Sequence, residues 1–143
     1  MDACSGTVYG VIFPGARLPA GCSLYQIPVD ASNLRLDVVT LVDTNDEVPP
    51  EVKQNPLSIE QVTFEDSKAN AVIQSSWASE LAHVFAMVVV YDTNGAIIGY
   101  GEYPEITVPA NGEFPVEIWY SNVQGKPAKV EIFAVPSEFS LIK

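Results

Sequence analysis

Basic side chains are scarce in this sequence, and their scarcity limits the partners that the chain can bind. Seven lysines and arginines stand against eighteen aspartates and glutamates among 143 residues, which gives a formal net charge of −11. Binding to nucleic acid requires a basic patch that displaces counterions from phosphates, and anionic membranes attract basic segments. The sequence therefore predicts neither a nucleic-acid partner nor attachment to an anionic membrane surface.

Long apolar runs are also missing. The longest, Leu81–Val90, contains a histidine and is far too short to cross a bilayer, so no membrane span is predicted. The first residues, Met-Asp-Ala-Cys, lack the charged and apolar regions of a signal peptide. A secreted protein would therefore be represented here in a processed or excised form.

Cysteine and histidine are rare, which restricts metal and redox chemistry. Cys4 and Cys22 flank a segment rich in glycine and proline, whose turns could place them side by side. A disulfide between them would close a loop of about 18 residues and contribute about 3 kcal/mol in the chain-entropy model; two unpaired thiols are the alternative. With His83 they lack the close paired spacings of structural zinc, so neither a metal nor another cofactor is predicted.

Hydrophobic residues, in contrast, are plentiful and follow the pattern of β-strands. They make up 48% of the chain, and charged residues make up only 17%, which indicates a filled core and one ordinary domain. Alternating apolar and polar positions between turn residues predict short strands at 5–13, 22–29, 34–42, 57–64, 68–77, 81–91, 96–102, 106–108, 114–120 and 128–134. With no convincing amphipathic helix, the pattern indicates an all-β, antiparallel, immunoglobulin-like β-sandwich.

The acidic, proline-rich stretch 46–56 is the best internal linker, because a helix cannot pass through Pro49-Pro50. It divides the chain into N-terminal strands at 1–45 and a β-sandwich at 57–143. The N-terminal strands would either complete that sandwich or belong to a preceding module.

Segment 81–91 is apolar at both its odd and its even positions. This pattern is typical of a central strand, or of a strand whose outer face is covered by another segment or another chain. The residues Asp92-Thr93-Asn94-Gly95 that follow predict a tight turn with glycine in a left-handed conformation.

Several of these residues carry a resemblance to a known family. Val88-Val89-Val90-Tyr91-Asp92, the following Asn94-Gly95 and Ile98-Gly99, and the corner Pro109–Pro115 resemble the FxLYD domain over roughly residues 57–135. Val88 and Val90 stand where the name motif has Phe and Leu. The resemblance implies an immunoglobulin-like module outside the cytoplasm, in the cell envelope or secreted, and no catalysis.

Exposed aromatic residues are the main candidates for an interaction surface. If Phe114, Val116, Ile118 and Tyr120 fill the core, Trp119 must point outward. A final hairpin at 124–127 would place Phe133 outward on the neighbouring strand, with Tyr100 and Tyr103 nearby. Such residues serve as sugar platforms or as anchors of protein interfaces; a second small hydrophobic cluster is the alternative.

Catalytic and calcium sites are less well supported. His83 has no assignable nucleophile or orienting acid, and no two of the carboxylates at 102, 105, 113 and 117 can be paired from the sequence. The acidic stretches 43–47 and 92–94 could supply calcium ligands, but Asp and Asn are also favoured in turns. We therefore expect a non-catalytic, extracellular or cell-envelope module that binds protein or self-assembles, with a carbohydrate-binding module as the alternative.

Overall fold

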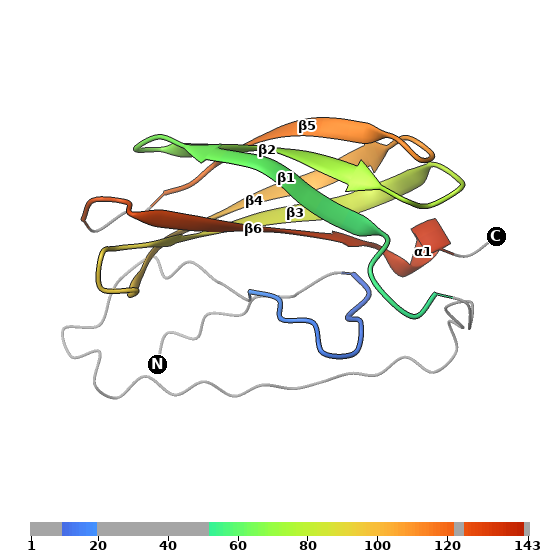
Figure 1. Ribbon diagram of the computed structural model, residues 1–143, viewed down its shortest axis with the longest axis horizontal. Helices are drawn as coiled ribbons and strands as arrows, with labels where there is room; N and C mark the ends of the chain where they lie inside the picture. Colours follow the sequence, from blue (N-terminus) through green and yellow to red (C-terminus); the bar gives the residue numbers. More distant parts are fainter. Residues whose placement is uncertain (1–9, 20–51, 122–124, 142–143) are drawn as a thin grey trace, which may run out of the picture.

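The protein is a β-sandwich of two antiparallel three-stranded sheets, seen in a computed structural model that describes residues 10–19, 52–121 and 125–141 (Figure 1). This confirms the predicted all-β sandwich. One sheet has the order β1 (Leu57–Phe64), β2 (Lys68–Ser75), β5 (Glu113–Trp119). The other has the order β4 (Ile97–Val108), β3 (Leu81–Tyr91), β6 (Lys129–Pro136), and one helical turn that the sequence did not predict, α1 (Glu138–Leu141), follows it.

The two hairpins, β1–β2 and β3–β4, lie close to where the sequence predicts them. β1 and β3 have the predicted limits, and β2 ends two residues early. In the turn after β3, Asp92 Oδ1 accepts hydrogen bonds from the backbone N–H groups of Asn94 (2.8 Å) and Ala96 (2.9 Å). Gly95 adopts the predicted left-handed conformation, at φ +80°.

The connection between β5 and β6 differs from the prediction. The two strands belong to different sheets, so they do not form a hairpin with each other. Alternation of apolar residues shows which face of a strand is buried, but it does not identify the neighbouring strand. The placement of Phe133 on a strand next to that of Trp119 was wrong for this reason.

Two other strand predictions also need correction. Residues 10–13, the described part of the predicted first strand, are not in a strand, although Pro14-Gly15 does form the expected turn. β4 continues through Pro104 to Val108 where two short strands were predicted, because an edge strand tolerates a residue without an N–H. The strands predicted at 22–29 and 34–42 lie outside the described residues.

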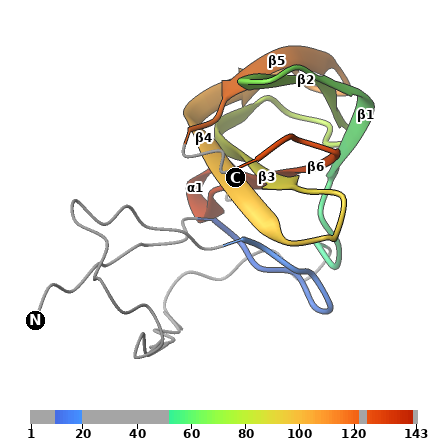
Figure 2. The ribbon, with the colours of Figure 1, turned by 90° about the vertical axis from the view of Figure 1, so that its left-hand side faces the viewer.

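The central strand β3 is buried on both faces. Val84, Ala86, Val88 and Val90 belong to the core between the sheets, whereas Met87 and Val89, on the opposite face, are 6% and 4% exposed. The segment 10–19 passes on this outer side of the sheet (Figures 1 and 2), where Val11 N donates to Pro136 O (3.0 Å). Its Phe13 is buried as a member of the core cluster.

The two sides of the sandwich are built differently (Figure 2). On one side β4 approaches β5 closely: a Cβ added to Gly101 would lie 2.2 Å from the carbonyl oxygen of Trp119, and Tyr100 pairs with Ser121. On the other side Asn55 Nδ2 donates to Ala134 O (2.8 Å), which ties the start of β1 to the end of β6. No described helix is long and apolar enough to span a membrane.

Candidate functional site

Trp119 is the most exposed of the predicted aromatic residues. It pairs with Lys68 across β2 and β5, next to the wholly buried Ile118, and its own side chain is 61% exposed. Lys68 Nζ lies 5.6 Å from the indole centroid and 3.0 Å from Glu117 Oε2. The hydrogen bond to Glu117, followed by that carboxylate's charge, raises the pKa of Lys68.

Polar side chains surround Trp119 on this outer face. Residues paired across an antiparallel sheet lie on the same face. Two rows of paired residues across β1, β2 and β5 share the face of Trp119: the nearer row is Thr63, Asn70 and Glu117, and the farther row is Ser58, Gln74 and Glu113. The surface therefore combines one exposed indole with carboxylates, amides and hydroxyls. Such a surface can stack on a sugar ring or pack against a protein.

The other three predicted residues lie on the opposite sheet. Tyr100 pairs with Val89 and Phe133 pairs with Met87, so both flank β3 on its outer face, half-buried. Tyr103 pairs with the core residue Ala86, on the other side of β4, and is 38% exposed. Tyr100 and Phe133 therefore share the outer face of one sheet, on either side of β3, whereas the Trp119 side chain lies on the outer face of the other sheet.

Tyr100 is tied to its own strand by a hydrogen bond. Its hydroxyl donates to Glu102 Oε1 at 2.6 Å. Burial first, and then the Glu102 carboxylate, raises the pKa of this phenol well above its ordinary value. Tyr100 therefore stays neutral and acts as a hydrogen-bonding and packing group.

An open cleft of about 520 Å³, which the sequence did not predict, lies at the start of β6 and is lined by Arg17, Tyr91, Asp92, Thr93, Gly95, Ala128, Lys129 and Glu131. Glu131 accepts hydrogen bonds from Lys129 Nζ (2.6 Å) and Tyr91 Oη (2.9 Å). Lys129 Nζ also lies 5.4 Å from the centroid of the Tyr91 ring. The sequence indicated only that Lys129 and Glu131 lie on one face of a predicted strand. It did not indicate the cleft, because Arg17 comes from a distant segment of the chain.

The charges in this cleft influence one another. Hydrogen bonds from Lys129 and then from Tyr91 lower the pKa of Glu131, and the hydrogen bond to Glu131 raises the pKa of Lys129. Burial, followed by Glu131, raises the pKa of Tyr91. Among the described residues Arg17 forms no salt bridge, and its charge adds to the lowering of the pKa of Glu131.

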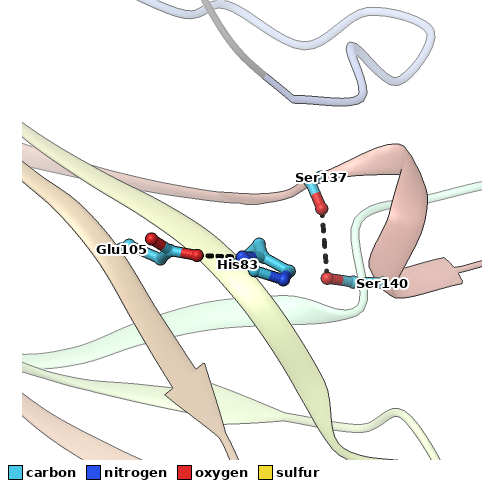
Figure 3. A network of polar contacts seen from close by, with 4 residues as sticks. All are labelled: His83, Glu105, Ser137 and Ser140. Atoms are coloured by element: carbon cyan, nitrogen blue, oxygen red, sulfur yellow. Dashed lines mark hydrogen bonds and ion pairs between the residues drawn. The ribbon is translucent and has the colours of Figure 1, made fainter.

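His83 is paired with a carboxylate that the sequence could not assign. The pairing of β3 with β4 contains two bulges. From the pair Leu81 and Val108 to the pair Val84 and Ile106, β3 has one residue more than β4. From there to the pair Ala86 and Tyr103, β4 has one residue more than β3. These two bulges place the side chains of His83, at φ +55°, and Glu105 together, with His83 Nδ1 bonded to Glu105 Oε1 (Figure 3). The first bulge also turns Leu81 into the core, which strict alternation did not predict.

Two serine hydroxyls lie close to this pair in the fold. Ser137 N donates to the backbone oxygen of His83 (3.0 Å), and the Ser137 and Ser140 hydroxyls bond each other at 3.2 Å (Figure 3). A hydrolytic triad needs the serine hydroxyl bonded to the imidazole. Here the hydroxyls bond each other, and the side chains of His83 and Glu105 are 55% and 56% exposed.

The remaining candidate sites involve metals and cysteines. Cys4, Cys22 and the acidic stretch 43–47 lie outside the described residues. Asp92 uses its carboxylate within its own turn, where the Ala96 N–H chiefly lowers its pKa. Within the part of the chain that the structure describes, no group of three or more His, Cys, Asp or Glu side chains could hold a metal ion.

Comparison with known protein families and with curated proteins finds no match to this chain.

Proposed function

We propose that this chain is a non-catalytic β-sandwich module that functions by binding another protein, in the cell envelope or outside the cell. The observation that carries the proposal is the side of the sandwich formed by β1 and β6. Both are edge strands, and β1 exposes Val62 (43%) and Phe64 (39%) there. Sheet edges with exposed apolar side chains are sites at which other chains add strands.

The strand order supports an immunoglobulin-like module. The sheet β1-β2-β5 has the order of strands A, B and E in immunoglobulin domains, and the sheet β4-β3-β6 has the order of strands C′, C and F. The location outside the cytoplasm rests on the resemblance at Val88–Asp92 and Pro109–Pro115.

Site-specific photo-crosslinking tests the proposal. A benzophenone amino acid replaces Phe64 at the apolar edge, and in a matched variant it replaces Ser58, which is exposed on the outer face of the same strand. Incubated with envelope and secreted fractions of the source cells, the Phe64 variant should form a protein adduct that mass spectrometry identifies. The Ser58 variant should not form it. Absence of protein adducts at Phe64, in a folded variant, would contradict the proposal.

Carbohydrate binding is a second candidate, supported by the exposed indole of Trp119 among polar side chains. Titration with a glycan panel should then shift the tryptophan fluorescence, and W119F should abolish the shift. Trp77, half-buried against the core, remains in that variant as an internal reference. No response of the wild-type protein to any glycan would rule this candidate out.

A further inference from the structure

Asparagine followed by glycine occurs twice in the chain, at Asn94-Gly95 and Asn111-Gly112. In such a pair the side-chain amide carbon of asparagine lies within reach of the next backbone nitrogen. Glycine has no side chain to hinder the approach, and it tolerates the backbone angles that the approach requires. The reacting nitrogen must first leave its own hydrogen bond, so the surrounding fold decides which of the two asparagines can react.

The turn at Asn94 is held by hydrogen bonds within itself. Asp92 Oδ1 accepts from the N–H groups of Asn94 and Ala96, Asp92 O accepts from Gly95 N (3.1 Å), and Asp92 N donates to Ala96 O (2.9 Å). Residues 93–96 are exposed, and a Cβ added to Gly95 would meet nothing within 4 Å. Opening this turn therefore breaks only local bonds, and openings of this kind need the least free energy.

The turn at Asn111 is tied to a different part of the chain. Asn111 N donates to Trp77 O (2.8 Å), and Gly112 O accepts from Ser75 N (2.8 Å). A Cβ added to Gly112 would lie 2.9 Å from Pro109 Cβ, so this backbone is closely packed. Freeing the Gly112 nitrogen, which donates to Pro109 O (3.1 Å), therefore disturbs contacts with the end of β2 as well as its own turn.

We propose that Asn94 is a site of spontaneous deamidation and that the fold protects Asn111 from the same reaction. The Gly95 nitrogen forms a bond to Asn94 Cγ, the Cγ–Nδ2 bond breaks, and the amide leaves as ammonia with the proton of the Gly95 N–H. Water then opens the cyclic imide at either carbonyl, which gives aspartate or isoaspartate. The reaction needs no oxidant or metal, and it does not depend on the proposed binding function.

The product has a carboxylate where Asn94 had an amide. The Ala96 N–H chiefly lowers the pKa of Asp92, and the backbone and side-chain N–H groups of Asn94 add to this effect. The side chains of Asn94 and Asp92 therefore interact, and a carboxylate at position 94 replaces that attraction with repulsion. We expect the product to weaken this turn, which lines the cleft with Asp92, Thr93 and Gly95.

Peptide mapping of the full chain, aged in mildly alkaline buffer and digested in mild acid, tests the proposal. Each digest reports both turns, so one site is the control for the other. In the folded protein Asn94 should convert about tenfold faster than Asn111, because its turn opens more readily. In denaturant the two sites should convert at similar rates, since both asparagines precede glycine. A methyltransferase specific for isoaspartate should label the Asn94 peptide.

Three variants sharpen the test. N94Q, whose longer side chain closes the ring much more slowly, should not be labelled at this turn. N94D has the aspartate product in every molecule and should speed hydrogen exchange of the Ala96 amide about threefold or more. N111D, the same change in the other turn, should leave the exchange of Ala96 unaltered.

Equal conversion of the two sites in the folded protein, or faster conversion of Asn111, would overturn the proposal. An Asn94 that stays intact while the denatured chain converts would also overturn it, because the turn would then be protective. Unchanged exchange of Ala96 in N94D would overturn the expected weakening of the turn. Crosslinking at Phe64 is independent of these measurements, so the proposed function is tested separately.

Discussion

The two sides of the sandwich show how one fold can be closed along one seam and left accessible along the other. Where β4 meets β5, the backbone of Gly101 packs on that of Trp119, with no room for a side chain. Where β1 meets β6, Asn55 donates a hydrogen bond across the sheets at one end, and Val62 and Phe64 are exposed toward the other. The two sides therefore differ in how closely their backbones approach and in how much apolar surface they expose.

The largest effect should come from filling the closed side. G101V would push a branched side chain into the Trp119 carbonyl group, and overpacking of a close backbone contact costs about 3 kcal/mol or more. Urea unfolding measures the loss. S58V, which adds a similar side chain on the exposed face of β1, should change the stability little. Equal effects of the two substitutions would show that the β4–β5 side is not tightly closed.

A smaller effect should follow from cutting the link across the open side. N55A removes the bond to Ala134 O and the bond that Asn55 Oδ1 accepts from Leu57 N (3.1 Å). Loss of part-buried hydrogen bonds of this kind costs about 1–2 kcal/mol. S76A removes an exposed bond to Pro56 O and is the matched control. If thermal melting shows the two variants to be equally stable, Asn55 does not hold the sheets together.

The smallest effect should appear in the pH dependence of the open side. The pKa of Glu131 is lower in the folded protein than its ordinary value because of Lys129 and Tyr91. The unfolded chain therefore binds more protons, so the stabilisation is present above the ordinary carboxyl pKa and is lost as the pH falls through the folded pKa. Urea midpoints of wild type and E131Q should differ at neutral pH and converge in acid. A difference that stays constant with pH would contradict this.

The sequence predicted individual strands well, and their partners poorly. The limits of β1 and β3 follow from β-branched and aromatic residues between turn residues, which are local signals. The assignment of β5 and β6 to different sheets depends on contacts between distant segments, which alternation does not encode. Trp119 was correctly predicted to be exposed, but its grouping with Phe133 failed with the pairing.

The sites that the sequence missed depend on geometry that only the paired chain has. His83 and Glu105 meet because β3 and β4 each carry an extra residue, and a bulge is defined only relative to the partner strand. The cleft needs Arg17 beside Lys129 and Glu131, far apart in the chain. Neither the His83–Glu105 pair nor the cleft can be proposed until the fold is known.

The burial of Phe13 and Leu141 in one core has a consequence for how the protein folds during synthesis. The central strand β3 pairs with β6, near the end of the described chain, as well as with the adjacent β4. Contacts between residues so distant in sequence slow folding, and a ribosome releases the chain from its N-terminus. β1 to β5 must therefore leave the ribosome before the core can close, and until β6 emerges β3 has one unpaired edge.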